Sequence, residues 1–133
     1  MAQLDTLFFA GGHASRYLDE SGKFHVSYLC EAVGVGPAVF ARLTKRQTES
    51  VAGLFSSGFV QPREPRTREV LKELLQIVGV FNAMGWSTQD VSRWMNAPLP
   101  TFGGRTPTEL IELGRGQELI TRLVDLAAGN VGS

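Results

Sequence analysis

A cysteine nucleophile needs a histidine base, and this chain offers one cysteine, Cys30, and two histidines, His13 and His25. Cys30 falls on the inward face of a predicted helix, where a free cysteine is usually a buried structural residue. The two histidines lack the spacing of metal ligands, and His25, just before that helix, fits a surface or capping position. We therefore expect no catalytic residue, no metal and no cofactor, and we interpret the chain as a protein that is not an enzyme.

Two glycine clusters invite comparison with phosphate-binding loops. Gly34-Val35-Gly36 has no third glycine after it, and no Lys-Ser/Thr pair follows Gly103-Gly104. The acidic pair Glu109 and Glu112 falls on the exposed face of a predicted helix, where a solvated surface is favoured over acid and base catalysis. These patterns indicate turns and solvated surface.

A basic group, Arg42, Lys45 and Arg46, lies at the end of a predicted helix that would be the second of a helix-turn-helix. The first residues of that helix, Pro37 to Val39, cannot make bidentate contacts to base edges. Two interpretations stay open: salt-sensitive DNA binding dominated by phosphate contacts, and a solvated helix end that complements the helix dipole.

In the N-terminal half, the sequence predicts short helices that would position Cys30, His25 and the basic group. Apolar residues at helical spacing predict one helix over 26–33 and, after a glycine turn, a second that Pro37 opens. Alternation over 23–29 would also suit a short strand, but we favour the helix. A further amphipathic stretch runs from Gln47 to Phe55, and Gly58 ends it. Residues 26–44 thus have the plan of a helix-turn-helix.

Two prolines, Pro62 and Pro65, mark the best candidate boundary in the chain. We place the junction near residue 65, between an N-terminal helix-turn-helix-like region, 1–65, and a C-terminal region, 66–133. From Arg66 to Met84 the apolar residues recur at spacings of three and four, which predicts a long helix that contacts both halves.

The C-terminal half has clear helix start and stop signals. Ser87 with Asp90 predicts an N-cap, and Val91, Trp94 and Met95 would be the buried side of that short helix. Thr106-Pro107-Thr108-Glu109 predicts a capping box for a helix that ends at Gly114. A last helix should run from Gly116 to Ala128 with Gly129 as its C-terminal cap. The expected fold class is all-α: a compact helical domain.

The composition mainly excludes classes of partner and of covalent cross-link. The 133 residues hold 13 Lys+Arg and 13 Asp+Glu, so overall charge demands neither nucleic acid nor an anionic membrane. The single cysteine excludes an internal disulfide. There is no apolar run of about 18 residues, and the start, residues 1–5, lacks a basic signal region. We expect a cytoplasmic chain without membrane contact.

An ordered set of motifs resembles the C-terminal toxin-binding domain of Xre/MbcA/ParS-type antitoxins. The set comprises Trp94-Met95, residues 96–99, Phe102-Gly103-Gly104-Arg105-Thr106-Pro107-Thr108-Glu109-Leu110-Ile111, Gly116, and a Leu/Val-rich helix that closes at Gly129. The resemblance covers about Val70 to Gly129. Met95, Leu99 and Phe102 depart from the Leu, Asn and Leu of the family pattern.

The resemblance implies an antitoxin of a type II toxin-antitoxin system. Its partner would be a cognate RES-domain toxin that consumes NAD or transfers ADP-ribose, which the C-terminal helices and tail would neutralise by occluding the active site. Such chains commonly carry a helix-turn-helix and repress their own operon, so operator DNA, a homodimer and a hetero-oligomer with the toxin are expected. The alternative is a stand-alone helix-turn-helix regulator whose C-terminal half dimerises.

On this resemblance we assign ten toxin-binding candidates, in which the contributions of individual arginines are our inference. They are Trp94, Gly104, Arg105, Thr106, Pro107, Arg115, Gly116, Arg122, Gly129 and Asn130. Arg105, Arg115 and Arg122 could each pair with carboxylates of the toxin, or could each be solvated.

Overall fold

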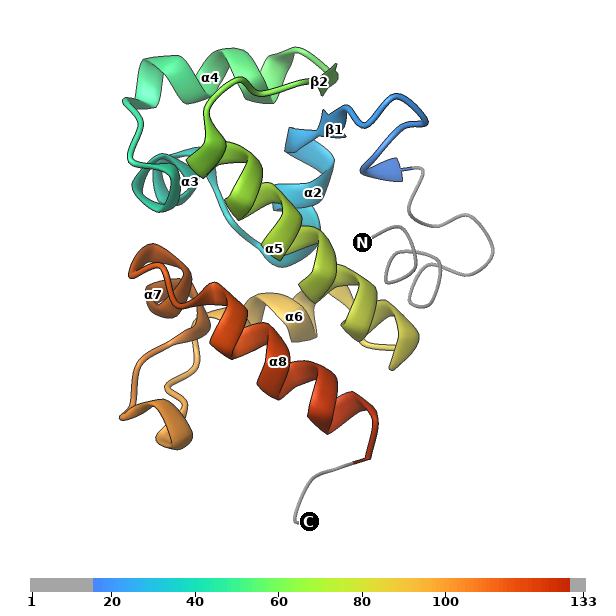
Figure 1. The fold of residues 1–133 in the computed structure, drawn as a ribbon, viewed down its shortest axis with the longest axis vertical. Coiled ribbons are helices and arrows are strands. Elements are labelled where there is room, and N and C mark those ends of the chain that lie inside the picture. The colour runs from blue at the N-terminus through green and yellow to red at the C-terminus, as the bar shows by residue number, and fades with distance from the viewer. Residues whose placement is uncertain (1–15, 130–133) are drawn as a thin grey trace.

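The computed structural model describes residues 16–129, so His13, the first five residues and Asn130 lie outside the part described here. Over this range the fold is mostly helical, and the predicted all-α class is confirmed. Figure 1 shows the helices arranged around one long central helix, with the N-terminal elements above and the C-terminal ones below.

Three short helices follow each other in the N-terminal half: α2 (Val26–Val33), α3 (Pro37–Thr44) and α4 (Thr48–Ser56). The axes of α2 and α3 meet at 101°, within the range typical of helix-turn-helix pairs. Gly34 ends α2 with a positive φ of 70°, and a side chain there would overlap Ser92 of the C-terminal half. Glycine is therefore required at this turn both for its backbone conformation and for its close contact with another helix.

A small sheet, which the sequence did not predict, joins the two ends of this half. Strand β1 (Phe24–His25) pairs antiparallel with β2 (Phe59–Val60), with Phe24 opposite Val60. Strand β1 ends after two residues because His25 becomes the N-cap of α2, its Nδ1 accepting a hydrogen bond from the Tyr28 N–H at 3.3 Å. Both expectations for residues 23–29 thus hold in part, and His25 is confirmed as a capping residue.

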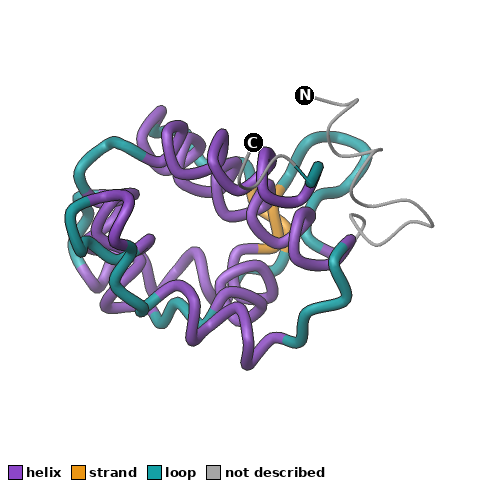
Figure 2. Tube along the Cα trace, turned by 90° about the horizontal axis from the view of Figure 1, so that it is seen from below, coloured by secondary structure: helices purple, strands orange, loops and turns teal. Residues whose placement is uncertain are grey.

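Helix α5 (Pro65–Ala83) is the long predicted helix and contacts elements of both halves. It packs against α2 and α3 on one side and against α8 (Gly116–Ala127) on another. Figure 1 shows α5 and α8 running in a similar direction. Figure 2 shows the arrangement of the helices from below. The expectation of a central helix in contact with both halves is confirmed.

The remaining C-terminal elements begin where their caps predict. Helix α6 (Thr88–Met95) has a capping box between Ser87 and Asp90, and α7 (Pro107–Glu112) has one between Thr106 and Glu109. A 3-10 turn, η2 (Pro100–Phe102), lies between them. Trp94 corrects one expectation, because it is only partly buried beside the buried Val91 and Met95.

One hydrophobic cluster contains buried residues from both sides of position 65, from Phe24 to Leu123. Among residues 16–129 no single helix is long and apolar enough to cross a membrane. The bent pair α2 and α3 meets that test together by length and composition, yet its apolar residues, such as Leu29, Phe40 and Leu43, are buried in the core.

Candidate functional site

The loop between α6 and α7 is a closed turn. The Leu99 N–H donates to the Arg105 carbonyl and the Gly104 N–H donates to the Leu99 carbonyl, both at 2.9 Å. Gly103 and Gly104 both have positive φ, 70° and 84°, which a side chain would strain. The Gly-Gly pair therefore lets the chain reverse and leaves the Arg105 side chain exposed.

The start of α7 is fixed from two sides. The Thr106 N–H donates to Glu109 Oε1 at 2.8 Å, and this bond is the largest reason that the pKa of Glu109 is lowered. Pro107 is buried at the first helical position. The buried Thr108 hydroxyl donates to the Met95 carbonyl at 2.8 Å and so ties α7 to the end of α6. Thr106 and Pro107 thus shape this surface from within.

The three predicted arginines differ in their surroundings. Arg115 donates to both carboxylate oxygens of Glu118, at 3.1 and 3.0 Å, which raises the pKa of the arginine. Its guanidinium also lies 5.7 Å from the centre of the Phe102 ring. Arg105 and Arg122 are exposed, and neither forms an ion pair within 4.0 Å in the described part of the chain, although the charge of Arg105 also lowers the pKa of Glu109. Arg122 and Arg105 are therefore the guanidiniums available to a partner.

A small pocket of about 120 Å³ opens between the η2 turn and α8, close to Arg122. Its walls are mostly apolar side chains from α6, the loop and α8. They are Trp94, Leu99, Thr101, Phe102, Leu119, Arg122, Leu123 and Leu126. We call this the η2–α8 pocket.

Gly116, the first residue of α8, lies directly against Glu73 of α5, and a Cβ there would overlap the Glu73 carboxylate. Glu73 is 2% exposed, and its Oε1 has no hydrogen-bond partner within the described residues. Burial is the main cause that raises the pKa of Glu73 to about 7, followed by the nearby charge of Glu69. Gly116 therefore allows the close contact between α5 and α8.

At the far end of α8, Gly129 adopts the predicted left-handed conformation, with φ of 82°.

The three residues of the predicted basic group, Arg42, Lys45 and Arg46, have different surroundings. Arg42 pairs with Glu112 at 3.5 Å, and Lys45 Nζ donates to the Glu112 backbone carbonyl at 3.5 Å. Both contacts join the end of α3 to the end of α7. Lys45 itself has a positive φ of 59° at the C-cap of α3.

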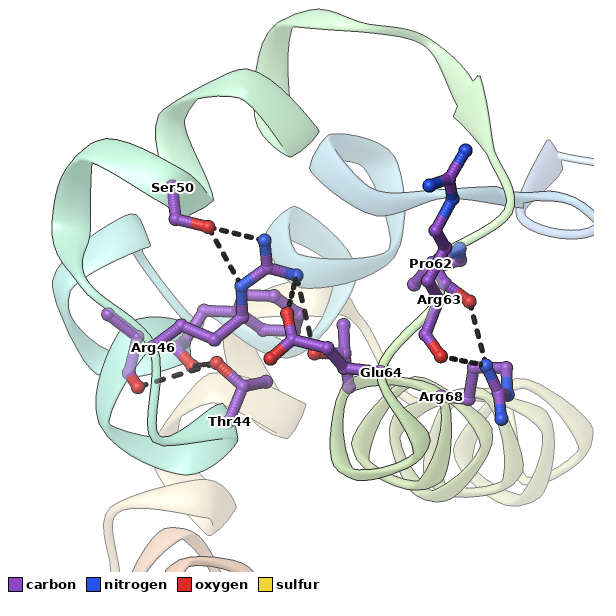
Figure 3. A network of polar contacts seen from close by, with 10 residues as sticks. Thr44, Arg46, Ser50, Pro62, Arg63, Glu64 and Arg68 are labelled. Atoms are coloured by element: carbon purple, nitrogen blue, oxygen red, sulfur yellow. Dashed lines mark hydrogen bonds and ion pairs between the residues drawn. The ribbon is translucent and has the colours of Figure 1, made fainter.

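The third basic residue, Arg46, lies within a polar network (Figure 3). It pairs with Glu64 at 3.0 Å and donates to the hydroxyls of Ser50 and Thr67. Its side chain is only 15% exposed. Arg46 thus links α3, α4 and the start of α5, which leaves Arg42 and Lys45 as the exposed cations of the group.

The candidate nucleophile is buried. Cys30 is 0% exposed, and desolvation raises the pKa of its thiol to about 12, so it stays protonated at neutral pH. No group of three His, Cys, Asp or Glu side chains able to hold a metal occurs within residues 16–129.

Two residues that organise the site were missed at the sequence level. Arg66, in the first turn of α5, donates to the carbonyls of Leu43 in α3 and Ile111 in α7. A cation is unfavourable at a helix N-terminus, which was an available hint of a tertiary partner. Glu73 interrupts the apolar face of α5, but nothing in the sequence pairs it with Gly116.

The fold is compact and helical, and backbone hydrogen bonds hold the loop between α6 and α7. The sequence model of the family described as antitoxin Xre/MbcA/ParS C-terminal toxin-binding domain matches residues 82–129. This segment is similar to the toxin-binding domain of that family, and the resemblance inferred from the sequence is confirmed. No curated protein matches the chain. No solved structure matches it either.

Proposed function

We propose that this chain is the antitoxin of a type II toxin-antitoxin pair and that it neutralises a RES-domain toxin that consumes NAD or transfers ADP-ribose. The observation that carries the proposal is the match of residues 82–129 to an antitoxin toxin-binding domain. In this role the chain does no chemistry itself and inhibits by covering the entrance to the toxin's active site.

The geometry of the C-terminal segment supports such a role. The α6–η2–α7 connection is held by backbone hydrogen bonds, two capping boxes and the Thr108 contact to Met95. A surface that is ordered before binding loses little conformational entropy on association. The exposed guanidiniums of Arg105 and Arg122 are accessible at this surface for pairing with carboxylates of the toxin.

Co-expression with the product of the adjacent reading frame tests the proposal. Growth should be rescued by the wild-type chain, the two proteins should co-purify, and cellular NAD should be preserved. Deletion of residues 116–133 would remove the buried Leu119, Ile120 and Leu123 from the core, so point variants are the better probes. A neighbouring product that neither binds nor harms the cell would contradict the proposal.

Regulation of its own operon is the second function we propose, together with a homodimer. The observation that favours it is the 101° crossing of α2 and α3, with Arg42 and Lys45 exposed at the end of α3. The same features would serve the alternative, a stand-alone regulator, which is favoured if no RES-type partner gene lies beside this one.

DNA binding is tested with the promoter fragment upstream of the gene. Arg42→Ala together with Lys45→Gly should weaken binding and lower its salt dependence, since two phosphate contacts are lost. Lys45→Gly suits the positive φ of this position. Arg63→Ala, an exposed position away from α3, is the control. Unchanged binding would place the DNA surface elsewhere, and sedimentation of the chain alone tests the dimer.

A further inference from the structure

The η2–α8 pocket is lined mostly by apolar side chains. With a volume of about 120 Å³ it has room for one side chain and not for a cofactor. It lies between the η2 turn and α8, within the segment that matches the toxin-binding domain.

The walls of the pocket are fixed before any partner arrives. Trp94 packs edge to face on Phe81, with ring centres 4.9 Å apart. Phe102 lies under the Arg115 guanidinium, and Leu99 is anchored through its backbone bonds to Arg105 and Gly104. Leu119 and Leu123 form the buried floor. A rigid, apolar, side-chain-sized pocket is the typical receptor of an interface hot spot.

The positive charge of Arg122 at the edge of the η2–α8 pocket favours a negatively charged group on the partner. Arg122 is exposed beside the pocket, and the structure shows no ion pair for it in the described residues, although Asp125 lies three residues further along α8. The neighbouring carboxylate of Glu118 is taken up by Arg115. An uncompensated guanidinium next to an apolar pocket complements an apolar side chain that has a carboxylate beside it.

We propose that the η2–α8 pocket receives one large apolar side chain of the toxin while Arg122 pairs with a carboxylate next to that side chain. The proposal rests on the proposed function and specifies the chemistry of the toxin segment that is recognised. The apolar anchor supplies most of the affinity, and the guanidinium sets the orientation of the segment.

The pocket is tested by filling it. Thr101 is an exposed residue of the pocket, and Thr121 is an exposed residue of α8 outside it, so Thr101→Trp and Thr121→Trp are matched variants. Each full-length variant is first checked for native helicity and melting temperature. Binding to the purified adjacent-gene product should weaken about tenfold or more for Thr101→Trp and stay near wild type for Thr121→Trp.

The charge is tested by reversing it. Arg122→Glu should weaken binding about tenfold or more, whereas Arg63→Glu, the same change at an exposed position before α5, should not. An Asp→Arg or Glu→Arg change in the toxin that restores binding to the Arg122→Glu variant would identify the paired carboxylate.

The possible results distinguish a failure of the proposal for the pocket from a failure of the proposed antitoxin function. Folded Thr101→Trp and Arg122→Glu variants that bind the toxin as tightly as wild type would overturn the pocket while the antitoxin role stands. If the Thr101→Trp variant breaks a dimer of the chain alone but still binds the toxin, the pocket belongs to the contact with a second copy. That result would also overturn the proposal for the pocket. If the wild-type chain binds no neighbouring product, both proposals fall together.

Discussion

Glu73 places a carboxyl group in the contact between α5 and α8. The groups that influence it are Glu69 and Arg66 on its own helix and Gln117 on α8, and Arg66 only partly offsets the effect of burial. With the pKa raised from 4.5 to about 7, the folded protein binds a proton that the unfolded chain releases more readily. The stability from this proton is fully present below about pH 4.5 and is lost as the pH rises through about 7.

Glu73→Gln should therefore remove a pH dependence. At pH 4.5 its stability should be close to wild type, and at pH 8.5 it should exceed wild type by about 1–3 kcal/mol, because no charge is left in the contact. Urea unfolding followed by circular dichroism at both pH values measures this. Glu20→Gln, the same change at an exposed position outside α5 and α8, is the control. A wild-type stability that is flat between pH 5 and 8.5 would contradict the assignment.

Gly116 gives the reciprocal prediction on the opposite helix. Gly116→Ala should destabilise the protein by about 1–3 kcal/mol, since its methyl group would overlap the Glu73 carboxylate. The φ of Gly116 is not positive, so backbone strain does not contribute.

Glu73→Ala opens space for that methyl group and provides the test of cause. In this background Gly116→Ala should be neutral or stabilising, because alanine is the better helix former. Equal destabilisation in both backgrounds, measured by thermal unfolding, would mean that the overlap is not the reason for glycine.

At the scale of elements, Arg66 connects three helices. Located in the first turn of α5, it donates to carbonyls near the C-terminal ends of α3 and α7, where a cation is favourable. The two halves of the molecule therefore meet at one side chain as well as through the apolar core.

Arg66→Met keeps the length of the side chain and removes these bonds. We expect a loss of about 2–3 kcal/mol in the free energy of unfolding, since charged hydrogen bonds to two carbonyls disappear. Arg63→Met, at an exposed position just before α5, should change stability by less than about 0.5 kcal/mol. Chemical denaturation of both variants decides the point, and equal stability would show that α3 and α7 do not depend on Arg66.

The elements themselves were largely predictable because their signals are local. Pro37 and Pro107 open helices, Ser87 and Thr106 cap them, and the 3.6-residue pattern of α5 marks its buried face. The toxin-binding segment was predictable from its ordered motifs. Its pocket was not, because its walls come from α6, η2 and α8 and meet only in the fold.

Long-range pairs explain the other differences between sequence and structure. The strands β1 and β2 are too short to leave a pattern, and they form because the chain brings Phe24 beside Val60. The partial burial of Trp94 follows from its place on the wall of the pocket. Arg46, a candidate DNA contact by sequence, lies in a network with Glu64 and Thr67 that only the fold assembles.

At the scale of the whole molecule, the hydrophobic cluster that both halves share within residues 16–129 predicts one cooperative transition. Leu74 of α5 is 0% exposed at the centre of this cluster. Leu74→Asp would bury an unpaired charge and should cost more than about 3 kcal/mol, unfolding both halves together. Lys72→Asp, exposed on the same helix, should cost less than about 1 kcal/mol.

Helicity by circular dichroism and tryptophan fluorescence from Trp86 and Trp94 should then report the same wild-type midpoint. The tryptophans lie in the C-terminal half, whereas helicity reports on both halves. Two separate midpoints would show that the halves fold independently, and a Leu74→Asp variant with wild-type helicity and melting would show that Leu74 is not part of the core.

The last prediction concerns the contact between the proposed DNA surface and the toxin-binding domain. Glu112 at the end of α7 pairs with Arg42 and accepts from Lys45 through its backbone, so its carboxylate competes with DNA phosphate for a cation of α3. Arg42 is 57% exposed, and exposed ion pairs are typically worth up to about 1 kcal/mol. Glu112→Gln keeps the backbone contact and frees Arg42, so promoter binding should tighten by up to about fivefold and depend more steeply on salt.

Glu118→Gln is the matched control, because Glu118 pairs with Arg115 on the side of the domain next to Phe102. In the Arg42→Ala background the gain from Glu112→Gln should disappear, since no guanidinium is left to release. Fluorescence anisotropy over a series of salt concentrations measures wild type, Glu112→Gln, Glu118→Gln, Arg42→Ala and the double variant. Weaker or unchanged binding by Glu112→Gln would exclude this competition. A gain confined to the chain with Arg42 would mean that any contact that draws Glu112 away from α3 also changes how tightly the chain binds promoter DNA.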